Sequence, residues 1–76
     1  MDYRDKLLNI AREVFNNGEI TLNSTRDEIK EWDSVGYLIL ITRIEEELSI
    51  SIPFEDIRKI NKIEDFLMYI SNKSAG

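Results

Sequence analysis

Apolar residues recur at helical spacing in three segments of the chain, the first of which lies at its start. Residues 2–17 carry an apolar stripe that consists of Leu7, Leu8, Ala11, Val14 and Phe15. Tyr3 lies one helical turn before Leu7. This spacing is typical of a helix with one buried face. Asn17 and Gly18 are residue types that end helices. We therefore expect a first helix over 2–17, with a structural role only.

The longest apolar segment runs from Val35 to Leu48. Its run 37–41 is also compatible with a buried strand, but the length of the whole segment favours a helix. One stripe of this helix is expected in the core: Tyr37, Leu40, Ile41, Ile44 and Leu48. A second stripe adjoins Ser34 and is only partly apolar: Val35, Ile39, Thr42 and Glu46. Two interpretations of the second stripe stay open, contact with a partner or an attached group, and additional core.

The connection over 18–32 is too long for a plain helical hairpin. Ile20, Leu22 and Ile29 are its scattered apolar anchors. Residues 25–28 (Thr-Arg-Asp-Glu) fit a capping box that can start a short helical turn. We expect Trp32 in the core, although an exposed contact is the other interpretation, because one Trp contributes much of the buried area in so small a domain.

After the long helix, the pattern predicts a short helix over 54–60 and a final helix. Pro53 stands where the short helix can begin. Residues 61–64 form a second cap with a reciprocal glutamate, followed by apolar residues at helical spacing: Ile63, Phe66, Leu67 and Ile70. We expect an all-α fold with one domain over 1–72 and a disordered tail over 73–76.

Composition excludes several kinds of chemistry. A chain of 76 residues buries only about 60% of its unfolded surface, and without Cys it has neither disulfides nor thiolate-held metal. Without His it lacks the usual imidazole base and the commonest zinc ligand, so a serine hydrolase is improbable and no metal site is expected. The sequence shows no signal peptide and no stretch of about 20 apolar residues, so we expect a cytoplasmic protein without membrane contact.

Negative charge is concentrated in the middle of the chain. The formal net charge is −5, but residues 27–56 hold nine acidic and two basic side chains, a local charge of −7, whereas the rest sums to +2. Acidic helix surfaces often serve solubility alone. Because this excess of acidic residues surrounds Ser34, a candidate functional residue, we favour a docking face for basic partners. Nucleic acid would be repelled.

The candidate serine lies at the start of the long helix. Asp33 and Ser34 are both residue types that cap a helix N-terminus. A hydroxyl held there meets free N–H donors and partial positive charge, which favour a phosphate attached to it. Gly36 costs about 1 kcal/mol relative to alanine inside a helix, so we expect either a close approach by a partner or a structural accommodation at this position.

These features together resemble an acyl carrier protein. The resemblance covers nearly the whole chain, through residues 7–15, 32–35, 44–53 and 63–66. It implies a four-helix bundle with a long first loop and a short third helix. It also implies that Ser34, beside Asp33, receives a 4'-phosphopantetheine arm from coenzyme A by a separate phosphopantetheinyl transferase. Because the chain has no thiol of its own, a carrier of thioesters must acquire one in this way.

The resemblance implies a carrier, not an enzyme. Acyl groups would travel on the arm as thioesters and be presented to ligating, synthase or acyltransferase enzymes with basic docking surfaces. We expect a monomer whose partners contact Val35, Ile39, Glu45 and Glu46, the last two being acidic positions of the family.

Departures from the family's pattern bear on the pathway. Val35 stands where Leu or Met is usual, and Ile39 replaces a partner-binding acid of fatty-acid carriers. The partner surface is thus more apolar than that of a housekeeping fatty-acid carrier. A Gly-Gly pair before the serine, common in peptidyl carriers, is absent, and residues 31–34 (Glu-Trp-Asp-Ser) look more like discrete carriers of specialised pathways, including polyketide, D-alanyl or modified-sugar systems. Two alternatives stay open, an aminoacyl or peptidyl carrier, and an interaction module that kept the fold but takes no arm and uses Ser34 only as a helix cap.

Overall fold

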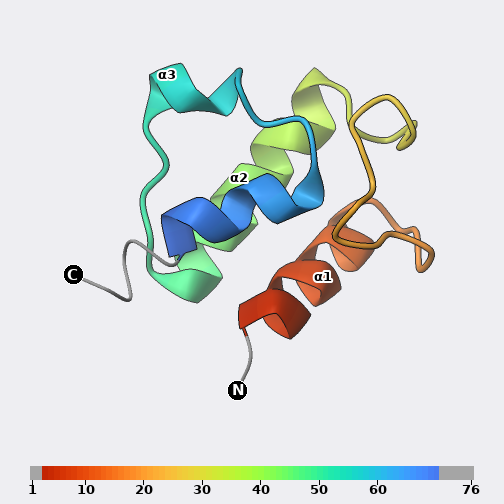
Figure 1. Ribbon diagram of the computed structural model, residues 1–76, viewed down its shortest axis with the longest axis horizontal. Helices are drawn as coiled ribbons and strands as arrows, with labels where there is room; N and C mark the ends of the chain where they lie inside the picture. Colours follow the sequence, from red (N-terminus) through yellow and green to blue (C-terminus); the bar gives the residue numbers. More distant parts are fainter. Residues whose placement is uncertain (1–2, 71–76) are drawn as a thin grey trace.

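The computed structural model describes residues 3–70, which are mostly helical (Figure 1). Four elements have defined bounds: α1 (Tyr3–Val14), α2 (Ser34–Leu48), α3 (Phe54–Ile57) and the 3₁₀ helix η1 (Ile63–Phe66). Residues 67–70 continue η1 as α-helix. The described part of the chain contains no strand, only an isolated bridge between Thr25 and Lys62. The expected all-α class is confirmed at this level, whereas the tail expected over 73–76 lies outside the described residues.

The first helix ends earlier than the sequence suggested. Asn16 adopts a left-handed conformation with a φ of 51°, and the N–H of Asn17 donates to the carbonyl of Arg12 at 3.0 Å. These contacts satisfy carbonyls of the last turn, as a helix-ending motif requires. Gly18 has no positive φ. The expected end of the helix at residue 17 is wrong, because α1 stops three residues earlier, at Val14.

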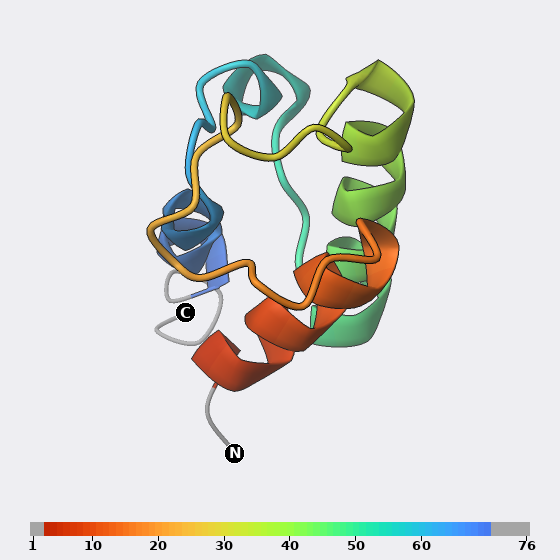
Figure 2. The ribbon, with the colours of Figure 1, turned by 90° about the vertical axis from the view of Figure 1, so that its right-hand side faces the viewer.

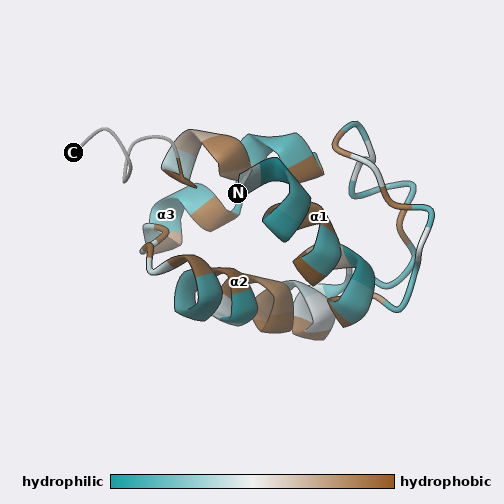
Figure 3. Cartoon of the chain, turned by 90° about the horizontal axis from the view of Figure 1, so that it is seen from below, coloured by the Kyte–Doolittle hydropathy of each residue, from teal (hydrophilic) through white to brown (hydrophobic). Residues whose placement is uncertain are grey.

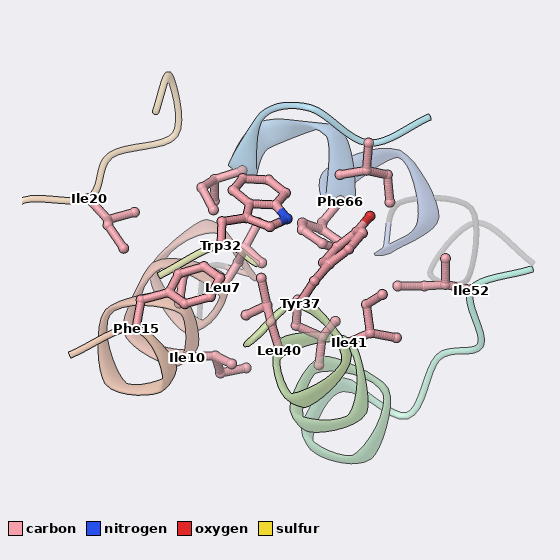
Figure 4. Close-up of a cluster of buried hydrophobic side chains, with 14 of the residues drawn as sticks. Leu7, Ile10, Phe15, Ile20, Trp32, Tyr37, Leu40, Ile41, Ile52 and Phe66 are labelled. Atoms are coloured by element: carbon pink, nitrogen blue, oxygen red, sulfur yellow. The ribbon is translucent and has the colours of Figure 1, made fainter. Parts of the chain in front are cut away.

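The core is a single cluster between α1, α2 and the C-terminal helical segment. α1 packs against both α2 and η1 (Figure 2). The expected core stripe of α2 is buried in full, and the last helical segment contributes Ile63, Phe66 and Ile70. Trp32 is 4% exposed and lies between Phe15 and Tyr37, with ring centroids 6.0 and 5.4 Å away (Figure 4). The interpretation of Trp32 as a core residue is confirmed.

The long first loop is fastened to the segment that follows α3. The N–H of Arg26 donates to the carbonyl of Asn61 at 2.7 Å, and the N–H of Ile63 donates to the carbonyl of Ser24 at 3.2 Å. Ile20 and Ile29 are buried beneath the loop as expected. This pairing brings residue 26 close to the end of α3, although 32 positions separate residues 26 and 58 in the sequence.

The two C-terminal helices differ from the expectation. α3 ends at Ile57 instead of residue 60, and the final helix starts as a 3₁₀ turn. The reciprocal acceptor at its start is Asp65, which accepts from the N–H groups of Asn61 and Lys62 at 3.0 and 3.1 Å. Glu64 was expected in that role, but its N–H is bonded to the loop. No helix over residues 3–70 has the length and apolar character needed to cross a bilayer.

Candidate functional site

The N-terminus of α2 is capped by Asp33. Its backbone is extended (φ −98°, ψ −173°), and its Oδ1 accepts from the N–H of Gly36 at 2.8 Å. Its carbonyl accepts the next N–H, that of Tyr37, at 2.8 Å. This is the geometry of an aspartate N-cap. Of the two residue types that could cap this helix, the structure therefore uses Asp33.

Ser34 is the first helical residue, and its side chain is exposed. Within the described range 3–70, no hydrogen bond engages its hydroxyl. Because Asp33 already supplies the capping oxygen, the Ser34 hydroxyl has no evident part in holding the helix. It stands at the helix start and in solvent, where an enzyme that modifies it can reach it.

Gly36 lies against the chain that leads into α2. A Cβ at this position would lie 2.3 Å from the carbonyl oxygen of Glu31 and 3.2 Å from Cε1 of Phe15. A backbone atom at that distance cannot give way without moving the turn. Of the two explanations for this glycine, the structure favours accommodation within the fold over close approach by a partner.

A groove of about 400 Å³ opens beside Ser34, between α2, the first loop and α3. Six residues line it: Arg26, Ser34, Tyr37, Leu38, Ile57 and Arg58. Tyr37 closes the groove from below, because its ring is buried and its hydroxyl donates to the carbonyl of Ile57. The groove is thus lined by apolar side chains together with the polar side chains of Ser34, Arg26 and Arg58.

The second stripe of α2 is exposed and does not add to the core. Val35 is 69% exposed and Ile39 is 50% exposed, and Leu38 beside them is 58% exposed. Figure 3 shows hydrophobic residues along α2 and hydrophilic residues at its C-terminal end. The interpretation of this stripe as additional core is wrong, because the helix turns Val35 and Ile39 away from α1.

The acidic run 45–47 is largely engaged inside the molecule. Glu45 is half-buried, and its carboxylate accepts from the N–H of Ile52 at 2.9 Å. Glu47 pairs with Arg43 at 2.6 Å, and Arg43 also pairs with Glu13 of α1 at 2.9 Å. These hydrogen bonds raise the pKa of Arg43, that from Glu13 contributing most.

Only the middle acid of this run is free of such contacts. Among residues 3–70, Glu46 has no hydrogen-bond or ionic partner, and it is exposed. It is the acid of the run best placed for a partner, whereas Glu45 serves the structure.

Burial also changes the pKa of Tyr37, the residue beneath the groove. Desolvation raises its pKa to about 12, against an opposing effect of the nearby Arg26 cation. Tyr37 is therefore uncharged at neutral pH, where its hydroxyl acts as a hydrogen-bond donor to α3.

Over residues 3–70, no three His, Cys, Asp or Glu side chains gather as a metal site would require. No family model matches the chain, and no solved structure matches it.

Sequence reasoning missed four residues that line this groove: Arg26, Leu38, Ile57 and Arg58. Leu38 was detectable, since it lies four positions after Ser34 and so shares its face of the helix. The two arginines carried no local signal, because only the pairing of the first loop with the segment after α3 brings them to the groove. The structure does bring Asp33, Ser34, Val35 and Ile39 together at one end of α2, while Glu45 and Glu46 lie at the other.

Proposed function

We propose that the protein is a discrete carrier with the four-helix arrangement of acyl carrier proteins, loaded on Ser34 with 4'-phosphopantetheine. It carries acyl or aminoacyl intermediates as thioesters to partner enzymes of a fatty-acid-like, polyketide or other specialised pathway. It catalyses no step itself.

One observation carries this proposal: the Ser34 hydroxyl is exposed at the first residue of α2, while Asp33 performs the capping. A serine kept only for helix stability would be expected to make the capping bond itself. Its freedom therefore weighs against the interaction module in which Ser34 is merely a cap.

The residues around Ser34 fit the attached group. The phosphodiester would meet the N–H groups of the first helical turn and the two arginines of the groove, both of which attract an anion. In loading, the Ser34 oxygen displaces adenosine 3',5'-bisphosphate from coenzyme A, and its proton passes to a base of the transferase. That base has to come from the partner, since no imidazole or paired carboxylate of this chain adjoins Ser34.

The exposed apolar residues define where partners would dock. Val35, Leu38 and Ile39 lie within the first two turns of α2, next to Ser34, and all three side chains are exposed. Their burial against a partner would supply the non-directional part of binding. Glu46 would add a charge that speeds encounter with a basic surface.

The loading experiment uses the purified protein, coenzyme A and a broad-specificity phosphopantetheinyl transferase. Intact mass should increase by one phosphopantetheine group in the wild type and in Ser51→Ala, and not in Ser34→Ala. Ser51 is the matched control because it is likewise exposed. A wild-type mass that stays unchanged, while a known carrier is loaded in the same mixture, would overturn the proposal and favour an unmodified interaction module.

Docking is tested separately with the transferase itself. Val35→Ser and Ile39→Ser should each slow loading without lowering the midpoint of urea unfolding, because both side chains are exposed. Met68→Ser is the control, since Met68 is 63% exposed and does not line the groove beside Ser34. Equal loading rates for all three variants would remove Val35 and Ile39 from the docking surface.

A further inference from the structure

The two arginines of the groove beside Ser34 stand out against the charge of the surrounding chain. Arg26 and Arg58 flank the strongly acidic segment 27–56 in the sequence, one on each side. The fold places both in the groove beside Ser34, and no carboxylate lines that groove. The local environment of the serine is thus more cationic than the sequence count indicated.

Neither arginine is neutralised by an acid of the described chain. Arg43, by comparison, has two carboxylate partners, on Glu13 and Glu47. Across residues 3–70, no ion pair engages Arg26 or Arg58. Their guanidinium groups are therefore available to bind an anion. A guanidinium offers five N–H donors suited to carboxylate or phosphate oxygens.

Tyr37 contacts Arg26 and the residue that precedes Arg58. The guanidinium of Arg26 lies over the Tyr37 ring, 5.6 Å from its centroid. The Tyr37 hydroxyl donates to the carbonyl of Ile57, which directly precedes Arg58. Tyr37 is also three positions after Ser34, so the two residues are neighbours on the surface of α2. One side chain therefore links the serine, the first loop and the end of α3.

We infer that Arg26 and Arg58 form an anion-binding pair that holds the phosphodiester attached to Ser34 at the groove. We choose the phosphodiester because it is bonded to the Ser34 oxygen itself. In the loaded protein it would therefore be the anionic group of the arm nearest to the groove. It would stand beside the Asp33 carboxylate, whose repulsion the two cations offset. Because this anion is present only when Ser34 is loaded, the inference rests on the proposed function.

The consequence is a restrained start to the arm. A phosphodiester held between α2, the first loop and α3 directs the following atoms along the groove, past its apolar lining residues Leu38 and Ile57. The attached chain would begin along the groove instead of pointing freely into solvent. Charge-assisted hydrogen bonds to guanidinium groups are strong enough to bias the direction of the arm. Where such bonds are exposed to solvent, they weaken as the salt concentration rises.

The first test needs no variant. In ¹⁵N-labelled wild type, the side-chain Nε–H signals of Arg26 and Arg58 should shift when Ser34 is loaded, whereas that of Arg43 should stay in place because its carboxylate partners already hold it. The shifts of Arg26 and Arg58 should shrink as salt is added. Unchanged signals for both arginines in a sample that mass spectrometry shows to be loaded would overturn the inference and leave the proposed function standing.

The second test follows the ³¹P resonance of the loaded protein. In the wild type its position should depend on salt, and in Arg26→Gln/Arg58→Gln this dependence should be lost. Lys30→Gln/Lys62→Gln is the matched control, because it removes the same charge from exposed residues outside the groove. The same salt dependence in both double variants would overturn the arginine pair.

A carboxylate on the cargo is the other possible source of the anion. Proteins loaded with succinyl and with butyryl groups on the arm separate the two sources. If the shifts of the arginine Nε–H signals are already complete without cargo and are equal for both cargoes, they support the phosphodiester as the bound anion. Shifts that arise only with the succinyl group would overturn that assignment. Failure of the wild type to load at all removes the proposed function and the inference together.

Discussion

The two ends of α2 carry opposite kinds of surface. At the N-terminal end, Val35 and Ile39 are exposed and the hydroxyl of Ser34 is without a partner in the described chain. At the C-terminal end, Glu45 is bonded to Ile52 and Glu47 is paired with Arg43. A charged end that is internally satisfied holds the fold together, whereas an apolar end left open is available for binding. The difference supports the proposed docking surface at the N-terminal end of α2 more than the charge count does, since two of the three acids of the run 45–47 are already engaged.

The open end depends on tight packing directly beneath it, and Gly36→Ala should break that packing. Its Cβ would meet the Glu31 carbonyl at 2.3 Å, so we expect a loss of about 2 kcal/mol, the cost of overpacking exceeding alanine's better helix propensity. Urea unfolding followed by Trp32 fluorescence measures it. Gly18→Ala is the control, because nothing lies within 4 Å of its added Cβ. Equal stability of the two variants would show that the turn before α2 yields easily.

The internally bonded end is tested by Glu45→Ala. Removing the carboxylate leaves the N–H of Ile52 without its acceptor, which should cost about 1.5 kcal/mol of unfolding free energy. Glu46→Ala, one position on, should stay within about 0.5 kcal/mol because its side chain is exposed. If the two variants unfold at the same urea concentration, the structural role assigned to Glu45 is wrong.

The assignment of the cap separates Asp33 from Ser34. Asp33→Ala should cost about 1 kcal/mol, because the N–H of Gly36 loses its acceptor. Ser34→Ala should change stability by less than about 0.5 kcal/mol and abolish loading. A reversed order of the two stabilities would make Ser34 the cap and would weaken the proposal that its hydroxyl is reserved for modification.

The smallest effect appears only in alkali. The pKa of Tyr37 is about 10 in the unfolded chain and about 12 in the folded protein, so the folded state retains the proton more tightly. The contribution of Tyr37 to the free energy of unfolding is therefore complete below pH 10 and is lost as the pH rises from 10 to 12. Burial also raises the pKa of Tyr69, which adds to the slope in the same direction.

Tyr37→Phe should therefore flatten the loss of stability between pH 10 and 12, as measured by urea unfolding with circular dichroism. Tyr3→Phe is the matched control for loss of a phenol hydroxyl, because Tyr3 is 46% exposed. A slope that is unaffected by Tyr37→Phe would assign the alkaline transition to other groups.

Much of the helical framework was predictable from local pattern. The apolar stripe of α2 is buried as its spacing indicated, and the start of α2 was expected one residue from its position in the structure. The ends of α1 and α3 were less accurate, since they depend on left-handed residues and loop contacts. Asn16 and Ser49, with φ of 51° and 54°, end their helices without glycine, and such positions leave only a weak trace in the sequence.

By itself, the sequence determined that the chain is helical, that Asp33 and Ser34 open the longest helix and that Trp32 belongs to the core. These features follow from side-chain type and from spacing within one or two turns, which neighbouring residues fix locally. Tertiary structure alone decided that Asp33 caps while Ser34 is free, that Gly36 accommodates Glu31, and that Arg26 and Arg58 share a groove with the serine. Each of these depends on backbone or side-chain contacts whose geometry exists only once the first loop, α2 and α3 have packed together.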